Sequence, residues 1–262
     1  MDRSAVSARP SPLRLRLRLR PPSPWTGKLF QGTNFGYPVR RAWAWAGSLC
    51  CLAAYLPAHA AGGHHAVDDA VILEPGQCEV ETWFDRERAS ARTLTHIGPA
   101  CRAGSVELAF NADSVRQDGL GRHTAGGPQL KWAHALTPTF SVGAVAAMTW
   151  RDRSPRALTA TVVLPITWQP DPLVAVHVNL GRDYRRGGEP DSSRSGVALE
   201  WMPLAQWSFL AERFRDSGAS HWRAGVRYQV SDRLSLDVSR AEGLRHRTPA
   251  WWTIGATWGF GR

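Results

Sequence analysis

The chain has 262 residues, of which 43% are hydrophobic, and a formal net charge of +10. Residues 1–60 hold nine of the 32 Lys and Arg and one of the 22 Asp and Glu, so residues 61–262 carry a net charge of only +2. Since the excess lies in a leader, the composition excludes a basic nucleic-acid-binding surface on the folded part. We expect one sizeable domain and no nucleic-acid partner.

Residues 1–38 have the composition of an unstructured leader. Leu and Arg alternate over residues 13–20, and Pro21, Pro22 and Pro24 follow. Low complexity of this kind leaves no core to bury. The pattern predicts a disordered extension or a wrongly assigned start codon; a basic arm on a membrane surface is the alternative.

Residues 39–60 have the features of a secretory signal peptide. Arg40 and Arg41 precede an uncharged apolar run over 42–57, and Ala58-His59-Ala60 supplies small residues at an A-x-A site. A positive start, a short apolar core and a small-residue exit predict export and cleavage after Ala60. The run is short for a transmembrane helix.

The next stretch, 61–76, is predicted to be a periplasmic N-terminal segment. It contains His64, His65, Asp68 and Asp69, whose imidazoles and carboxylates are the ligand types of zinc and copper. No second ligand cluster with recognisable spacing accompanies them, and mature N-termini are often polar and mobile. These four residues are candidate metal ligands, and a plain polar terminus is the alternative.

Cys78 and Cys101 are the only cysteines after the predicted cleavage site. Exported proteins meet an oxidising compartment, which favours a disulfide over two buried thiols. If the chain enters from the periplasm, both cysteines lie at the periplasmic ends of the first two strands, and the bridge holds those strands together.

The clearest structural pattern is a hairpin over residues 137–169. Its even positions are apolar, its odd positions are mainly small or weakly polar, and the charged stretch 151–156 separates two arms of about ten residues. Trp150 and Trp168 stand near the ends of the arms. Ten tilted residues span a bilayer, and interfacial Trp residues border such spans. The pattern predicts one hairpin of a transmembrane β-barrel.

Alternation of the same kind recurs along the chain and gives twelve strands. They are expected at 77–85, 92–98, 105–112, 129–135, 139–150, 157–168, 173–181, 195–201, 206–213, 221–230, 233–239 and 251–260. Short connections alternate with longer or more charged ones, including 113–127 and 214–220. This predicts an all-β fold, a single antiparallel barrel over 77–262, with 10 or 8 strands as the lesser alternatives.

With these features the chain resembles the Gram-negative outer-membrane β-barrel proteins, over roughly residues 77–262. The resemblance rests on the signal peptide, the alternating strands and the closing stretch Trp251–Phe260, although Gly261 and Arg262 follow the terminal aromatic. It implies an outer-membrane location, contact with outer-membrane lipids and insertion by the barrel-assembly machinery. A secreted soluble barrel or sandwich is the alternative. Such a fold turns its apolar face inward and carries charges on the other face along the middle of its strands. In this chain the second face is mainly small or weakly polar at mid-strand.

The inward face is predicted to be polar, since a charge facing lipid at the midplane costs about 2–4 kcal/mol. Both signs of charge occur, so the lumen is either a polar channel with a charged constriction or an ion-paired plug. The predicted lumen residues are Glu79, Glu81, Glu107, Lys131, His177, Asn179, Glu200, Glu212, Arg223, Arg227 and Asp237.

These features favour a narrow polar channel for passive uptake or efflux of small solutes. A structural or adhesive barrel without a pore is the alternative. An outer-membrane lipid hydrolase is a weaker one, because such twelve-stranded enzymes use a Ser–His pair facing lipid, whereas His177 has lumen parity. No catalytic residue and no cofactor are assigned, and the sequence does not indicate an oligomeric state.

Overall fold

A computed structural model describes residues 64–87, 89, 91–119, 121–152, 157–186, 190–245 and 248–261. The predicted leader, the predicted signal peptide and residues 61–63 lie outside the described residues. Among the residues described, no helix is long and apolar enough to cross a bilayer.

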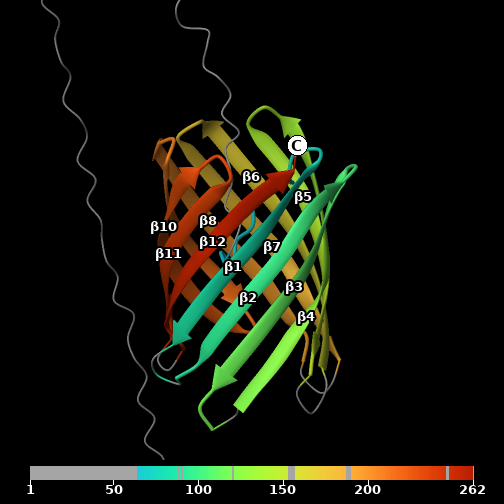
Figure 1. Cartoon of the computed structure of the whole chain (residues 1–262), viewed down its shortest axis with the longest axis vertical. Coiled ribbons are helices and arrows are strands. Elements are labelled where there is room, and N and C mark those ends of the chain that lie inside the picture. The colour runs from blue at the N-terminus through green and yellow to red at the C-terminus, as the bar shows by residue number, and fades with distance from the viewer. Residues whose placement is uncertain are drawn as a thin grey trace, which may run out of the picture. The chain divides into compact units, whose positions relative to one another are not determined.

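Twelve antiparallel strands form one closed barrel (Figure 1), as the sequence predicted. Each strand pairs with its neighbours in the chain, and the last pairs with the first, from Gln77↔Gly261 to Glu87↔Trp251. The strands are β1 Gln77–Glu87, β2 Thr93–Ala103, β3 Val106–Gln117, β4 Gly121–Thr137, β5 Phe140–Arg151, β6 Ala157–Asp171, β7 Val174–Arg186, β8 Ser192–Leu204, β9 Trp207–Asp216, β10 Ala219–Ser231, β11 Leu234–Gly243 and β12 Trp251–Gly261.

The two ends of the barrel differ in their connections. At one end, the short-turn rim, strands are joined through the pairs 104–105, 138–139, 172–173, 205–206 and 232–233, and β1 begins and β12 ends here. At the other end, the long-loop rim, the connections are 88–92, 118–120, 152–156, 187–191, 217–218 and 244–250. The predicted alternation therefore holds, with 217–218 as an exception.

Several strands are longer than their sequence pattern indicated. The expected connection 113–127 was wrong: β3 continues to Gln117 and β4 starts at Gly121. The expected loop 214–220 contracts to Ser217-Gly218, where both residues have positive φ. Two consecutive positive φ angles are those of a type I′ hairpin turn, whose twist matches that of the flanking strands.

Pro99 and Pro128, which lie just outside the expected strands, explain part of this misjudgement, and Pro165 has a similar place in a strand that was expected. Pro99, Pro128 and Pro165 each lie within a strand, where proline normally argues against one. In each case the regular pairing lapses on one side only: β2–β3 beside Pro99, β4–β5 beside Pro128 and β5–β6 beside Pro165. The ladder on the other side runs through the proline. Since proline lacks one N–H, a single lost contact is tolerated.

The outer surface is apolar and is bordered by aromatic side chains. Its exposed residues are the outward members of the period-two pattern, including Leu164, Leu180 and Leu199. Near the short-turn rim it carries Trp168, Trp201, Trp207 and Trp258, and near the long-loop rim Trp150, Trp222 and Trp252. An apolar band between two aromatic girdles matches the cross-section of a bilayer.

The predicted disulfide is present. Cys78 of β1 and Cys101 of β2 are directly paired in the register, with Cα atoms 4.0 Å apart and a bond between their sulfurs. It lies at the short-turn rim, where β1 begins and β2 ends, and so fastens the first hairpin at its open end.

Candidate functional site

The candidate site is the lumen, whose walls carry the polar members of the period-two pattern. Three of the predicted lumen residues, Glu79, Glu81 and Arg227, are half-buried. The other eight are buried: Glu107, Lys131, His177, Asn179, Glu200, Glu212, Arg223 and Asp237. Their chain neighbours Leu108, Trp132, Val178, Leu199, Trp222 and Val238 belong to the outward face.

Residues 64–73, which we call the lumen segment, lie inside the barrel. Val67 is 0% exposed and packs against Ala198, Leu210 and Phe214 on the walls of β8 and β9. A side chain at Gly196 would collide with Val67, so glycine there lets the segment approach β8. The sequence pattern predicted a periplasmic segment over residues 61–76; residues 64–73 of it lie in the lumen instead.

Glu212 holds the inner part of the lumen segment. Its two carboxylate oxygens accept hydrogen bonds from the backbone N–H groups of Ala66, at 3.2 Å, and Val67, at 2.9 Å. Arg223 lies 3.3 Å from the same carboxylate and donates a hydrogen bond to the carbonyl of His64. The ion pair of Glu212 and Arg223 thus provides hydrogen-bond partners for two N–H groups and one carbonyl of the segment. These backbone groups need such partners because the segment is in no strand or helix.

Lys131 holds the middle of the lumen segment through two carboxylates. Its Nζ lies 2.9 Å from Asp68 and 3.0 Å from Asp69. The amide of Asn179 faces the backbone of Asp68, with its oxygen 2.7 Å from the Asp68 nitrogen in the orientation that pairs donors with acceptors. Asp68 and Asp69, expected as metal ligands, therefore lie against a wall cation, which competes with a metal ion.

Near the short-turn rim the lumen segment meets further wall groups. Thr167 accepts a hydrogen bond from the Ala70 N–H at 2.8 Å, and Glu107 accepts one from the Leu73 N–H at 3.0 Å. Arg102 donates to the Leu73 carbonyl at 2.7 Å. The segment is thus held along its length by polar contacts, from the barrel's middle to the rim where β1 begins.

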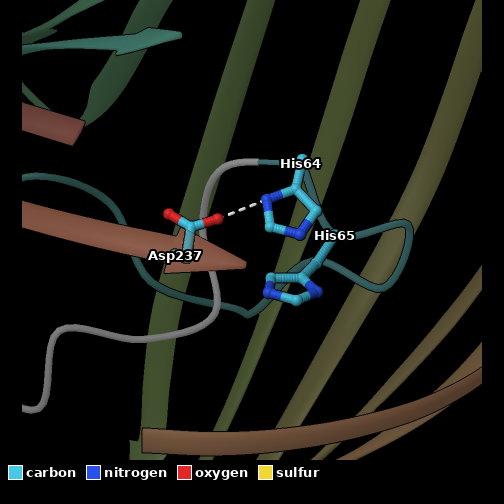
Figure 2. Close-up of side chains that lie close together, drawn as sticks. All are labelled: His64, His65 and Asp237. Atoms are coloured by element: carbon cyan, nitrogen blue, oxygen red, sulfur yellow. Dashed lines mark ion pairs between the residues drawn. The ribbon is translucent and has the colours of Figure 1, made fainter. Parts of the chain in front are cut away.

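His64 and His65 turn towards β11, away from the two aspartates that follow them in sequence. His64 contacts Asp237, and ligand-type atoms of His64, His65 and Asp237 all lie within 4.8 Å of one another (Figure 2). The sequence pattern singled out all three residues, but it indicated Asp237 as a lumen residue and not as a candidate metal ligand. Nothing in the local spacing joins residues 64 and 237, so only the fold could bring them together.

His177 is fully buried beside Thr167 and Glu200. Its Nδ1 lies 2.9 Å from the Thr167 hydroxyl, and its Nε2 lies 3.5 Å from Glu200. A hydroxyl, an imidazole and a carboxylate in sequence are the elements of a nucleophilic triad. Here the group faces the lumen, and the Thr167 oxygen also accepts the Ala70 N–H, which engages the hydroxyl in holding the segment.

Two inward carboxylate clusters were missed. Asp183 of β7 lies 2.8 Å from Arg194 and accepts a hydrogen bond from Thr161 at 2.8 Å. Asp113 of β3 contacts His96 of β2 at 2.6 Å, and the His96 ring stacks on Trp83 with centroids 3.4 Å apart. Both aspartates fall in stretches taken for loops, so extending the period-two parity through 113 and 183 would have found them.

The buried charges are mostly acidic. Within the described residues the buried acids are Asp69, Glu87, Glu107, Asp183, Glu200, Glu212 and Asp237, and the buried bases are Lys131 and Arg223. Such an excess produces a negative potential in the lumen, which attracts cations.

The solved structures most informative for this barrel are porins. The KdgM porin, solved in complex with disordered oligogalacturonate, matches with a TM-score of 0.55 over 70% of this chain and 99% of its own, at 8% identity. The NanC porin matches with a TM-score of 0.51 over 68% of this chain and 98% of its own, at 10% identity. At this identity the likeness establishes a common barrel fold, that of outer-membrane β-barrel proteins.

No curated protein matches the sequence closely enough to show a relationship. A family match does exist, and it runs from residue 49, before the first described residue, to residue 260 at the end of β12. It therefore includes the lumen segment together with all the strands. The chain belongs to the family described as uncharacterised conserved protein UCP029691.

Proposed function

We propose that this protein is an outer-membrane channel for passive movement of small polar solutes, narrowed by its own lumen segment. The observation that carries the proposal is a closed barrel with an apolar, Trp-bordered outer face and a charged, polar inner face. Charged side chains that face inward avoid the lipid, and they lower the free-energy cost of bringing water and polar solutes into the lumen. Export through a cleaved signal peptide and insertion by the barrel-assembly machinery belong to this proposal.

The contacts of the lumen segment suit a constriction that can shift. Most of them are hydrogen bonds and ion pairs to Glu212, Lys131, Thr167 and Glu107, all of which water can replace. The buried apolar contact is confined to the cluster around Val67. A segment held mainly by polar contacts in a hydrated lumen can exchange them for water, at a net cost of about 1 kcal/mol for a neutral hydrogen bond and about 1.5–3 kcal/mol for one to a charged group.

The proposed solutes are neutral or cationic. The KdgM porin was solved with oligogalacturonate, a polyanion. The present lumen has more buried acids than bases in its described part, so a polyanion is repelled where a cation is attracted. The proposal therefore uses the likeness to the KdgM porin for the fold alone and does not include an acidic sugar as solute.

A barrel with a structural or adhesive role is the second candidate, and one observation favours it. Part of the lumen segment is buried, with Val67 0% and Ala70 2% exposed, as expected of a permanent plug. The lipid hydrolase has weaker support, because the Thr167, His177 and Glu200 group faces the lumen.

Single-channel recording in planar bilayers tests the proposal. We expect small conductance steps from the wild type, and larger or more frequent openings from Lys131→Met and Glu212→Gln, each of which removes a hold on the lumen segment. Asp183→Asn is the matched control, because Asp183 faces the lumen but contacts Arg194 and Thr161, not the segment.

Two outcomes would contradict the channel and support another function. Folded wild type and both variants without conductance would support the structural barrel. Fatty-acid release from phospholipid by the same preparation, lost in His177→Gln, would support the hydrolase.

A further inference from the structure

Two histidines and an aspartate meet at the inner end of the lumen segment. Figure 2 shows His64 and His65 on the segment, with Asp237 reaching His64 from β11. Their side chains are 1%, 5% and 3% exposed, respectively. Three groups of the kinds that ligate metal ions are therefore enclosed together, and they come from stretches more than 170 residues apart in the chain.

The two imidazole rings of this cluster have different surroundings. His64 Nε2 makes a 2.6 Å hydrogen bond with the Ser239 hydroxyl, which leaves Nδ1 facing the Asp237 carboxylate. His65 Nδ1 lies 3.7 Å from Glu212, beyond hydrogen-bonding distance. His64 Nδ1 contacts the Asp237 carboxylate, whereas His65 Nδ1 makes no hydrogen bond within the described part of the chain. Burying an imidazole nitrogen without a hydrogen bond is costly, so His65 Nδ1 invites a ligand.

We infer that His64, His65 and Asp237 bind one divalent transition-metal ion, with Zn²⁺ as the reference ion. Two imidazoles and a carboxylate form a common zinc ligand set, with metal–nitrogen bonds of about 2.0–2.1 Å. Tetrahedral binding places donor atoms about 3.3 Å apart. The donor atoms here already lie within 4.8 Å, so side-chain rotation brings them to that spacing.

The neighbourhood supplies the rest of a metal site. With its proton on Nε2, His64 donates a hydrogen bond to the Ser239 hydroxyl, which orients the ring and leaves the Nδ1 lone pair for the ion, as second-shell groups do for metal-bound imidazoles. A cavity of about 10 Å³, lined by His65, Glu200 and Arg227 among others, lies beside the cluster and has room for about one water molecule. Arg223 and Arg227 oppose a cation here, but Arg223 lies 3.3 Å from Glu212 and Arg227 lies 3.9 Å from Asp237, so each is offset by a carboxylate.

Metal binding at this place has a mechanical consequence. Two ligands belong to the lumen segment and one to the barrel wall, so the ion joins the segment to β11. The site is thus a clasp that holds the constriction in place when metal is present. It is independent of which solute, if any, passes through the barrel.

The test is metal binding by the folded, metal-stripped, full-length mature protein in detergent. Titration calorimetry with ZnCl₂ should reveal one site per barrel, and Co²⁺ should give the visible absorption of a four-coordinate complex. His64→Gln combined with His65→Gln, and separately Asp237→Asn, should each weaken Zn²⁺ binding by at least about 100-fold, because each removes a ligand and loss of a mere second-shell partner already costs about 10- to 100-fold. His96→Gln is the matched control, since His96 is a buried lumen histidine paired with Asp113, and it should bind as the wild type does.

Stoichiometric binding that is unchanged in the His64, His65 double variant would overturn the proposal, and so would no binding by the wild type. If a variant fails to fold, zinc-edge X-ray absorption of the loaded wild type replaces it: two imidazole shells support the site, and their absence refutes it. None of these measurements uses conductance, so a failure here is separate from a failure of the proposed channel.

Discussion

Single residues in this barrel are sorted by parity, and the sorting is sharp along β6. Val162 and Leu164 are 44% and 51% exposed on the outer face, while Thr161 and Thr167 face inward and hydrogen-bond to Asp183 and His177. Side chains exposed on the outer face contact the hydrocarbon of the bilayer, which offers no partner for a charge. The same side chain should therefore have opposite consequences at positions of opposite parity.

Leu164→Arg should impair assembly, whereas Thr161→Arg should be tolerated. Leu164 lies at the centre of β6 beside Leu180, where an Arg costs about 2–4 kcal/mol. Thr161 points to the lumen beside Asp183, whose carboxylate can pair with the new guanidinium. Heat-modifiable mobility in gels measures the folded fraction. Equal losses for both variants would contradict the inward and outward assignments.

Parity made the lumen residues predictable, but not their partners. Glu107, Lys131 and Glu212 could be read as inward-facing because they alternate with apolar residues. Their partners are in residues 64–73, where no period exists, and the pairing of Lys131 with Asp69 spans 62 residues. Contacts of this range depend on the closed fold and leave no local trace in the sequence.

At the scale of elements, the sequence indicated the number and order of the strands better than their ends. Gly126, Gly127 and Pro128 together read as a loop, yet they lie within β4. A Cβ at Gly126 or Gly127 would collide with the backbone of a neighbouring strand, so these glycines permit close strand contact. In a closed barrel every strand has two partners, and one can maintain the ladder where proline interrupts the other.

The disulfide is the covalent link between two elements, and its loss should destabilise the barrel. Cys78 and Cys101 are separated by 23 residues, for which the chain-entropy model gives about 3 kcal/mol. The double variant Cys78→Ser, Cys101→Ser should lower the free energy of unfolding by about that amount, as measured by guanidinium denaturation in detergent. Reduction of the wild type should have the same effect and leave the variant unchanged. A wild-type midpoint that does not respond to reductant would contradict this role.

The whole molecule combines a closed wall with an internal segment that precedes it in the chain. Closure leaves no strand edge unpaired, so the backbone is satisfied within the wall and the inner side chains are free to bind the lumen segment. The segment runs from the cluster of His64, His65 and Asp237 to the short-turn rim, where it becomes β1. Its contacts reach β3, β4, β6, β7, β9, β10 and β11, so whatever moves it changes the lumen on several sides.

The acid excess of the lumen should make the open channel cation-selective. In a gradient of KCl across a planar bilayer, the reversal potential should indicate K⁺ permeating faster than Cl⁻. Removing one lumen charge with Glu200→Gln should reduce the permeability ratio by roughly two- to fivefold, since a unit charge at about 4 Å contributes about 1 kcal/mol even in water.

Glu74→Gln is the matched control, because Glu74 is exposed in the turn before β1 and should leave the ratio unchanged. The effect should shrink in high salt, where the Debye length becomes shorter than the lumen is wide. Anion selectivity, or equal shifts for both variants, would show that the buried acids do not set the potential along the path of the solute.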